Sequence, residues 1–447
     1  MPLLSRLSRH VFHPLLDLKE GSRRLAILRE LERTQWLPLE ELQVRQRRRL
    51  QDIVRYAGKH SEFYRRRFAA AGFDAANFDL DAFRRLPVLT KADIRSHTPA
   101  MLSDEFTFDS LGEHKTGGST GTSLTTHFDR DWLERRTADA MRSDRWAGCF
   151  HGMKIASIWG NPPQPETLRS RLRSWLIERF VYLDTMNLND ATMADFVARW
   201  RHERPEALFG HSHSLYMLAR YVTSQGITDL RPVGIISTSM MLLPQERAVI
   251  EKAFGCRVTD RYGCEEVGLI ACECERHHGM HLDIEHLYIE FLRPDGAEAQ
   301  PQEEGTIVVT DLFNRGMPFI RYRIEDVGVP SDRRCECGRG MPLMERVTGR
   351  VADYLKRQDG SLVAGVSLVE RTLTAIDGIE QMQIVQPAKS EIVLNIVRAP
   401  QYTKESEAQL LQEFTAVFGA GTRISIVPVE RIPQERSGKY RFSICQI

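Results

Sequence analysis

Apolar positions in the first hundred residues recur at helical spacing. Between residues 20 and 70 they fall three or four positions apart, which is the period of an amphipathic helix. Thr90 and Asp93 have the spacing of a helix N-cap and its third residue. The chain is therefore expected to begin with several amphipathic helices. The apolar residues of the pattern are Leu25, Ile27, Leu28, Leu31, Leu50, Ile53, Val54 and Tyr56.

The middle of the chain, from residue 130 to 345, alternates short apolar runs with helical patterns. Such alternation predicts α/β layers. Two apolar runs, 287–292 and 306–312, flank a turn-like stretch and are expected to form antiparallel strands. The other predicted elements in this part lie at 154–159, 191–202, 215–224, 233–238, 245–254 and 257–262.

After residue 350 the pattern becomes that of a small α+β unit of about a hundred residues. Strands are expected at 381–385, 392–398 and 423–428, with a helix at 404–418. We therefore predict two domains. Residues 1–348 would form a large multi-layer α/β domain with sheets and a small β-barrel-like part, and residues 349–447 would form a mobile α+β domain.

Length and charge narrow the class of protein. A chain of 447 residues is too long for one compact core. Its 61 basic and 60 acidic residues leave a net charge of +1, which disfavours a nucleic-acid binder or a polybasic anchor. No apolar run approaches a membrane span, and Arg6, Arg9 and His10 interrupt the first one. The expected location is cytoplasmic.

The run TGGSTGTS at residues 116–123 is a candidate phosphate-binding loop. Its glycines permit close approach of the backbone, and its hydroxyls can donate to phosphate oxygens. No Gly-Lys-[Ser/Thr] follows, so it is not a Walker A loop; an ordinary flexible hairpin is the alternative. The candidate phosphate ligands are Thr116, Gly117, Gly118, Ser119, Thr120, Gly121 and Thr122.

Three further segments carry charges that suit a nucleotide. Residues 260–266 (DRYGCEE) follow a predicted strand, where a carboxylate can hold Mg²⁺ and Tyr262 can stack on a purine. Residues 321–328 (RYRIEDVG) offer an acid for ribose hydroxyls. Lys439, near the end of the chain, is a mobile charge that could reach phosphates. Solvated turns and salt-bridged strand ends are the structural alternatives.

Four of the eight cysteines form two Cys-x-Cys pairs, which is typical of a metal site in a reducing compartment. Thiolates together with an imidazole suit tetrahedral Zn²⁺ in a closed structural site. Reduced, unligated thiols are the alternative. The candidates are Cys272, Cys274, His277, His278, His281, Cys335 and Cys337.

The ordered set TGGSTGTS, YGCEEVG, RYRIEDVG, GRVADYLK and SGK resembles the adenylate-forming superfamily. The motifs HSEFYR at 60–65, LPVLTKADIR at 86–95, ACEC at 271–274 and CECGR at 335–339 are similar to its phenylacetate–CoA ligase and CapK-like branch. The likeness spans residues 30–445. It implies an AMP-forming ligase. Such an enzyme activates a carboxylic acid with ATP to give an acyl-adenylate and pyrophosphate, and then transfers the acyl group to a thiol, usually CoA.

The resemblance also implies roles for individual residues. Lys439 would be the catalytic lysine, and Glu266 the carboxylate associated with Mg²⁺. The 116–123 loop would hold the phosphates of ATP. The remaining nucleotide contacts would be Tyr262, Gly263, Asp326 and Arg350. The ligands of a structural Zn²⁺ would be Cys274, His281, Cys335 and Cys337.

The chain departs from the family pattern at three places. The phosphate loop lacks a lysine after its last glycine, and Cys264-Glu265 replaces a small residue followed by Ser or Thr. The hinge has Ala352 where the family has an acid, although Asp353 is adjacent. Because the hinge serves the second half-reaction, adenylation is the firmer prediction.

Three functions are therefore carried forward. The first is acid activation followed by transfer to CoA. The second is adenylation with transfer of the acyl group or AMP to another acceptor: an amine, a sugar, a carrier thiol or a cofactor hydroxyl. The third is a nucleotide-binding protein without catalysis. The identity of the acid and the oligomeric state, including a homodimer, stay open. The predicted wall of the acid pocket is 208–216 with 237–239, where His211 and His213 are more simply explained as structural groups.

Overall fold

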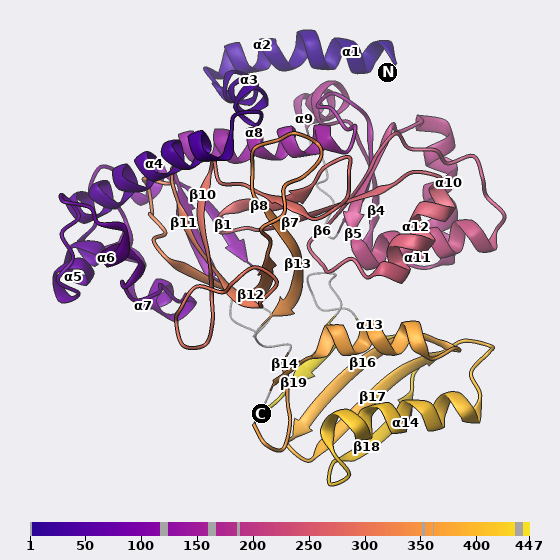
Figure 1. Cartoon of the computed structure of the whole chain (residues 1–447). Helices are drawn as coiled ribbons and strands as arrows, with labels where there is room; N and C mark the ends of the chain where they lie inside the picture. Colours follow the sequence, from indigo (N-terminus) through magenta and orange to yellow (C-terminus); the bar gives the residue numbers. More distant parts are fainter. Residues whose placement is uncertain are drawn as a thin grey trace.

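The computed structural model of the chain describes residues 2–116, 124–159, 167–185, 188–350, 354–360, 362–433 and 441–447. Figure 1 shows a large α/β part and a smaller part that contains the C-terminus. The predicted N-terminal helices are present. The side chains of Thr90 and Asp93 cap one of them reciprocally, as expected. These elements are α1 (Leu3–Leu7), η1 (Ser8–Phe12), α2 (His13–Glu20), α3 (Arg24–Thr34), α4 (Leu39–His60), α5 (Glu62–Ala70), α6 (Leu80–Arg84), α7 (Lys91–Met101) and η2 (Phe108–Ser110).

One sheet of 11 strands organises the large part, in the order β10-β11-β12-β13-β9-β8-β7-β6-β5-β3-β4. Strands β3 to β7 run parallel, and β7 to β13 pair antiparallel. The strands expected to form a barrel-like part instead continue the parallel strands as the antiparallel end of this open sheet. The strands are β3 (Ile155–Trp159), β4 (Phe180–Asp184), β5 (Ala207–His211), β6 (Ile235–Thr238), β7 (Val258–Cys264), β8 (Gly268–Glu273), β9 (Met280–Leu282), β10 (Leu287–Leu292), β11 (Gly305–Asp311), β12 (Tyr322–Pro330) and β13 (Leu343–Arg350).

Helices cover this sheet, and two separate apolar cores lie between the helices and the strands. Ile235, Ile250 and Leu218 belong to the core around the parallel strands, where α10, α11 and α12 lie (Figure 1). Leu50, Phe83 and Tyr322 belong to the core between α4–α7 and the antiparallel strands. None of the helices in the described ranges is both long and apolar enough to span a bilayer. The covering helices are α8 (Arg130–Trp146), α9 (Leu168–Arg173), η3 (Ser174–Glu178), α10 (Asp190–Glu203), α11 (Ser212–Ser224) and α12 (Pro244–Phe254).

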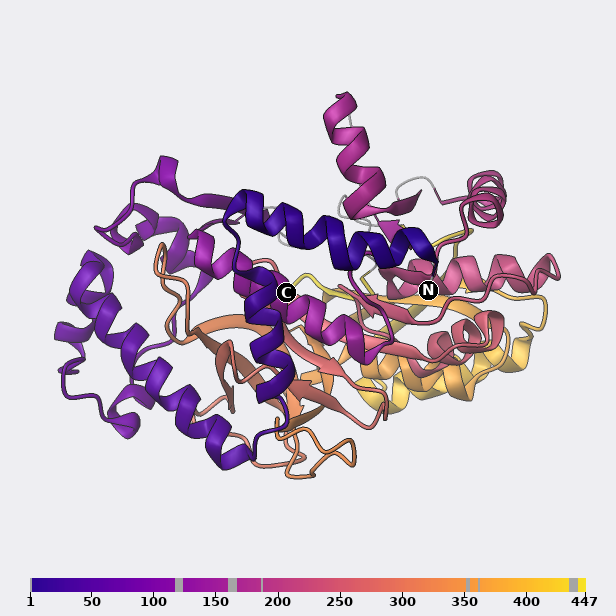
Figure 2. The ribbon, with the colours of Figure 1, turned by 90° about the horizontal axis from the view of Figure 1, so that it is seen from above.

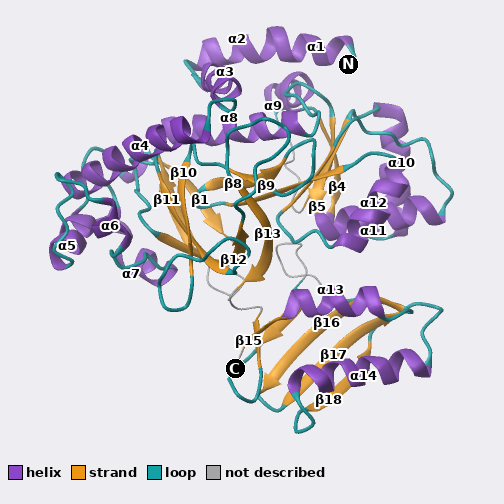
Figure 3. Ribbon diagram, in the orientation of Figure 1, coloured by secondary structure: helices purple, strands orange, loops and turns teal. Residues whose placement is uncertain are grey.

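The smaller part has its own four-stranded sheet, in the order β18-β17-β16-β19, and its own apolar core. Helix α13 lies on the side that faces the large part (Figure 3). The predicted helix and third strand of this unit have the expected limits. The elements are β14 (Tyr354–Lys356), β15 (Leu362–Ala364), α13 (Gly365–Ala375), β16 (Ile379–Ala388), β17 (Glu391–Arg398), α14 (Lys404–Phe418), β18 (Arg423–Pro428) and β19 (Ser443–Cys445).

Helix α11 of the large part contacts this smaller unit through side chains. Arg220 forms an ion pair with Glu380, and Gln381 Nε2 lies 3.5 Å from the Met217 sulfur. The predicted mixed α/β class, with a large sheet and a smaller C-terminal sheet, is confirmed. The predicted boundary at residue 349 stays a prediction.

Candidate active site

A two-stranded hairpin carries the predicted phosphate loop. Strand β1 (Gly112–Thr116) pairs antiparallel with β2 (Leu124–Phe128), and Thr116 lies opposite Leu124 at the end of the ladder. Six of the predicted phosphate ligands lie beyond that ladder, outside the described residues: Gly117, Gly118, Ser119, Thr120, Gly121 and Thr122. The structure therefore gives the base of the loop.

Arg136, on α8, links the hairpin base to the acidic turn after β7. Its Nη2 donates to Glu265 Oε2 at 2.8 Å, and its Nη1 donates to the His114 ring, 3.1 Å from Nε2. Burial, with the Arg136 charge next, lowers the pKa of His114, so the imidazole is neutral and can accept this bond. Glu265 is one of the departures from the family motif. In this chain it forms part of a brace for the hairpin.

Tyr262 and Asp326, predicted for adenine and ribose, contact each other. Tyr262 Oη donates to Asp326 Oδ2 at 2.7 Å, joining β7 to β12. Asp326 also lies opposite Arg350 in the β12–β13 ladder, so the backbone brings these two predicted ribose residues together. Three predicted nucleotide residues therefore share one edge of the sheet.

Gly263 allows the β7–β8 hairpin to close. A Cβ at this position would lie 2.4 Å from the Gly268 carbonyl oxygen, so any side chain would push the strands apart. This contact explains the glycine without a ligand, and its predicted role in nucleotide binding stays a prediction.

Glu266 is buried in the turn after β7, and the Cys264 thiol lies within electrostatic reach of both Glu266 and Asp326. Tyr322 Oη donates to Glu266 Oε1 at 3.0 Å. Burial, followed by the charge of Glu266, raises the pKa of both the Tyr322 hydroxyl and the Cys264 thiol. Both neighbours therefore keep their protons, and Glu266 is held by neutral groups. Carboxylate oxygens are among the ligands that Mg²⁺ prefers in proteins.

Lys91 braces the residue that precedes Asp326. Its Nζ donates to Glu325 Oε2 at 2.9 Å, and Glu325 has a positive φ of 76°. A side chain held in this left-handed region costs free energy that neighbouring contacts must offset. Leu89 adds a backbone bridge to β12 through Tyr322. The motif LPVLTK therefore fixes the backbone that presents Asp326.

Lys439 lies outside the described residues, so its predicted role is not tested. The residues that follow it rejoin the small sheet, where Gln383 Nε2 donates to the Arg441 carbonyl at 2.8 Å. The ring of Phe442 lies 6.2 Å from that of His213, at the start of α11. Phe442, three residues after Lys439 in the sequence, therefore lies beside the large part.

The predicted acid pocket lies where parallel strands end. Strands β3, β5 and β6 present their carboxyl ends at the same edge, which is the usual ligand side of such a sheet. His211 packs 4.3 Å from the Trp159 ring. His213 Nδ1 lies 2.5 Å from Glu246 Oε1, and both side chains are buried. These contacts agree with structural roles for the two histidines.

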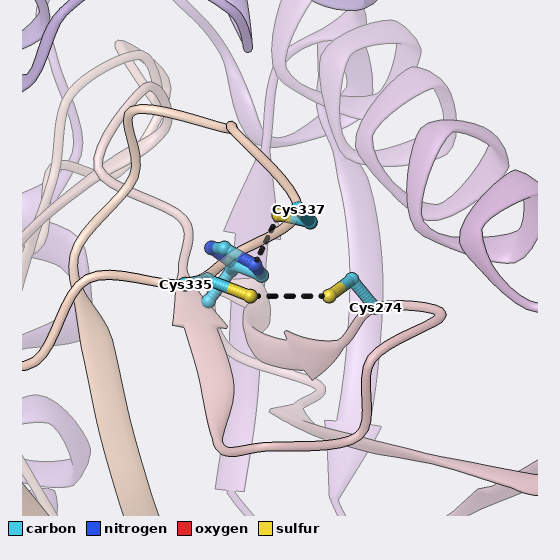
Figure 4. A group of neighbouring side chains, drawn as sticks. Cys274, Cys335 and Cys337 are labelled. Carbon is cyan, nitrogen blue, oxygen red and sulfur yellow. Dashed lines mark hydrogen bonds between the residues drawn. The ribbon is translucent and has the colours of Figure 1, made fainter.

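The four predicted zinc ligands converge. The donor atoms of Cys274, His281, Cys335 and Cys337 all lie within 4.8 Å of one another. Cys274 and Cys335 sulfurs are 3.6 Å apart, and Cys337 Sγ lies 3.3 Å from His281 Nε2. Figure 4 shows these cysteine side chains reaching from separate segments into one cluster. The segments are the end of β8, strand β9 and the β12–β13 connection.

Protonation of the thiols differs across the cluster. Burial raises the pKa of Cys274 and Cys335. Burial also acts against ionisation of Cys337, but hydrogen bonds from His281 and Arg339 outweigh it and lower its pKa to about 6. Backbone N–H groups of Arg276 and Arg339 point to two of the sulfurs, at 3.5 and 3.4 Å. Such donors are typical around metal-bound thiolates.

The competing metal-ligand candidates lie elsewhere. Cys272 is buried within β8 and its Sγ lies 3.3 Å from the Glu273 carbonyl. His277 Nδ1 lies 3.1 Å from Glu273 Oε2, and His278 is exposed. Among the described residues, the group that could hold a metal contains none of the three.

The sequence patterns did not single out Arg136, His114 or the Lys91–Glu325 pair as site residues. The signal for Lys91 was present in the motif LPVLTKADIR, but its partner lies 234 positions away. Arg136 and Glu265 are 129 positions apart, and charged residues surround Arg136 in the sequence. Such pairs become visible only in the folded chain.

Comparisons with known proteins agree with this arrangement. Residues 355–446 match the family model described as the CapK C-terminal domain. Protein CapK of Staphylococcus aureus is 23% identical over 411 residues, covering 90% of this chain and 89% of that protein. The phenylacetate-coenzyme A ligase of Thermus thermophilus is 24% identical over 446 residues, covering 91% and 96%.

A solved structure of 2-hydroxyisobutyryl-CoA ligase, in its postadenylation state, matches with a TM-score of 0.70 at 20% identity. It covers 89% of this chain, and 88% of that structure is matched. The resemblance inferred from the ordered motifs is thus confirmed: the chain is a homologue of CapK and the phenylacetate-coenzyme A ligases, and it has the fold of adenylate-forming CoA ligases.

Proposed function

We propose that the chain is an AMP-forming ligase that activates a carboxylic acid with ATP and transfers the acyl group to CoA. The observation that supports this most is the convergence of distant motifs on one sheet edge. Tyr262, Glu266 and Asp326 lie together there, and Arg136 ties the phosphate-loop hairpin to the same turn.

Adenylation would use these residues as follows. The acid's carboxylate oxygen attacks the α-phosphorus of ATP; an acyl–phosphate bond forms, and the bond to the leaving pyrophosphate breaks. The Asp326 carboxylate would accept hydrogen bonds from the ribose hydroxyls. The hydrogen bond that Tyr262 donates to it would hold the carboxylate in place. Glu266 would hold Mg²⁺, whose charge offsets that of the phosphates. Lys439 would stabilise the charge that develops on the non-bridging oxygens.

Transfer would follow at the same carbonyl. A thiol sulfur attacks the acyl carbon, a thioester forms and AMP leaves. CoA is the proposed acceptor because two of the relatives are named phenylacetate-coenzyme A ligases. The CapK relative supports a second proposal, in which an amine, a sugar, a carrier thiol or a cofactor hydroxyl replaces CoA. Ala352 at the hinge favours that alternative, because domain rotation serves the transfer step.

We further propose that Zn²⁺ binds Cys274, His281, Cys335 and Cys337. Two thiolate sulfurs at about 2.3 Å from a tetrahedral ion would lie about 3.7 Å apart, close to the 3.6 Å between Cys274 and Cys335. Three thiols and one imidazole fill a tetrahedral shell, so the ion would be structural. It would join the end of β8 to the β12–β13 connection, next to the strands that carry the nucleotide residues.

Pyrophosphate release with a panel of carboxylic acids tests the proposal, each acid being assayed with and without CoA. Acid-dependent release without CoA, followed by thioester formation with it, is expected. Lys439→Ala should lower adenylation by about 10²–10³, whereas the exposed Lys404→Ala is the matched control. ATP binding without pyrophosphate release from any acid would support the non-catalytic alternative. Pyrophosphate release followed by acyl transfer only to acceptors other than CoA would support the second proposal.

A further inference from the structure

The first helical segment of the chain, α1–η1–α2, is packed against the protein through polar side chains. Ser5 bonds to Glu206, Ser8 Oγ donates to the Leu176 carbonyl at 2.6 Å, and Asp17 pairs with Arg24. His13 is buried with them. A helix on a soluble protein normally buries its apolar face instead. This segment is oriented the other way.

Five large apolar side chains of this segment consequently face outward. They recur every three or four residues, so they form one continuous stripe along the helix. Leu3 is 75% exposed and Leu18 79%. The stripe consists of Leu3, Leu7, Val11, Leu15 and Leu18.

A second helical segment, α9–η3, adds to this apolar area. Leu168 is 85% exposed, and Leu172 and Trp175 follow at helical spacing with more than half of each side chain exposed. The two segments touch, because Ser8 of η1 bonds to Leu176 of η3 and Arg173 pairs with Glu20 at 3.1 Å. Both views of the ribbon place them on the same side of the molecule (Figures 1 and 2).

We call the side chains of both segments the leucine surface: Leu3, Leu7, Val11, Leu15, Leu18, Leu168, Leu172 and Trp175. It holds about half of the exposed large apolar side chains among the residues that the structure describes. Clustering on that scale marks an interaction site rather than ordinary scattered exposure.

Charge indicates the partner. Arg6, Lys19 and Arg23 are exposed along the first segment. The acids of both segments are engaged: Asp17 is buried against Arg24, and Glu20 and Glu178 pair with Arg173. The leucine surface is therefore bordered by outward cations. A second copy of the chain would present the same cations and repel, whereas an anionic bilayer would attract them.

We propose that the leucine surface docks on an anionic lipid bilayer. The helices lie in the headgroup plane, with the leucines and Trp175 inserted at the acyl boundary and the cations among the phosphates. Tryptophan is suited to this depth because its ring is apolar and its N–H is polar. The docked enzyme stays on one side of the bilayer.

Vesicle co-sedimentation of the full chain tests the proposal. Vesicles of phosphatidylcholine with about a third phosphatidylglycerol should bind the protein, and pure phosphatidylcholine should bind it much less. Leu7→Ser combined with Leu15→Ser should lower partitioning at least tenfold, since each removes buried apolar area. Val44→Ser on α4, 69% exposed, is the control and should bind as the parent does. Equal binding by parent and double variant, or to both lipids, would overturn the proposal.

Tryptophan emission gives a second readout on folded protein. A blue shift on adding anionic vesicles should disappear in Trp175→Phe and persist in Trp36→Phe, whose ring is exposed elsewhere, on the α3–α4 connection. Sedimentation velocity separates the competing occupant. A dimer that the Leu7→Ser/Leu15→Ser variant abolishes, with no vesicle binding by the parent, would assign the leucine surface to a second copy and reject the bilayer.

Discussion

The nucleotide edge of the large part and the docking contact of the small part are built differently. At the nucleotide edge, Tyr262 and Asp326 stand on strands of one sheet and Glu266 lies in the turn after β7, and each has a hydrogen-bonded partner. Among the described residues, the small part meets α11 through the partly exposed ion pair Arg220–Glu380, a weak contact to the Met217 sulfur and the ring contact of Phe442 with His213. The side chains of the nucleotide edge are therefore held in fixed positions. The contacts between the small part and α11 are weak enough to break and form again.

This difference matches the two half-reactions of the proposed function. Adenylation depends on electrostatic groups that are already in position when ATP binds. Transfer requires the small part to change its arrangement, which weak contacts permit. Substitutions at the nucleotide edge should therefore reduce catalysis strongly. Substitutions at the docking contact should mainly alter the balance between the two steps.

Among substitutions in the described part of the chain, removal of the proposed ribose carboxylate should have the largest effect. Asp326→Ala deletes charged hydrogen bonds to two hydroxyls, so kcat/KM for ATP in pyrophosphate release should fall about a hundredfold. Tyr262→Phe removes only the bond that orients the carboxylate and should cost less. Asp81→Ala, an exposed carboxylate on α6, is the control. An unchanged kcat/KM in Asp326→Ala would exclude this residue from the nucleotide site.

Loss of a zinc ligand should act through stability. Cys335→Ser should abolish binding of about one zinc per chain, and the thermal midpoint should fall by the order of 10 °C, because metal binding stabilises only the folded cluster. Elemental analysis and calorimetry measure the two effects. Cys256→Ser changes a thiol outside the cluster and should retain the metal. A parent protein purified without chelator and free of zinc would refute the structural metal.

The brace at the hairpin should have an intermediate effect. Arg136→Met keeps much of the side-chain volume but removes the bonds to Glu265 and His114, so the phosphate loop loses its anchor. We expect KM for ATP to rise about tenfold, as for the loss of one charged hydrogen bond. Arg130→Met, on the same helix and 63% exposed, should leave KM unchanged. A similar loss in both variants would point to general damage to α8.

Periodicity predicted most elements, because burial of one face leaves a clear repeat. Strands β10 and β18 and helix α14 have the expected limits. It could not predict that the antiparallel strands join the parallel ones in one sheet, since pairing depends on partners far along the chain. The zinc ligands followed from residue type and family resemblance. The outward leucines of α1–α2 contradict the inward apolar face that helical periodicity usually implies.

The smallest effect should come from the docking contact, and its direction is informative. The Phe442 ring lies beside His213, which belongs to the predicted wall of the acid pocket, and we therefore expect this arrangement to be the one that carries out adenylation. Arg220→Gln removes the ion pair with Glu380 and should shift the population away from it. A partly exposed ion pair contributes up to about 1 kcal/mol to the docked arrangement. The rate of adenylation should therefore fall about two- to fivefold.

Thioester formation from supplied acyl-adenylate should not fall with it, because that step uses the other arrangement. Arg201→Gln, which breaks an exposed pair with Asp229 inside the large part, should change neither rate. Exchanging the charges, with Arg220→Glu and Glu380→Arg together, should restore adenylation. If Arg220→Gln instead lowered thioester formation and spared adenylation, the docked arrangement would belong to transfer. The fixed nucleotide edge would then work with a different position of the small part.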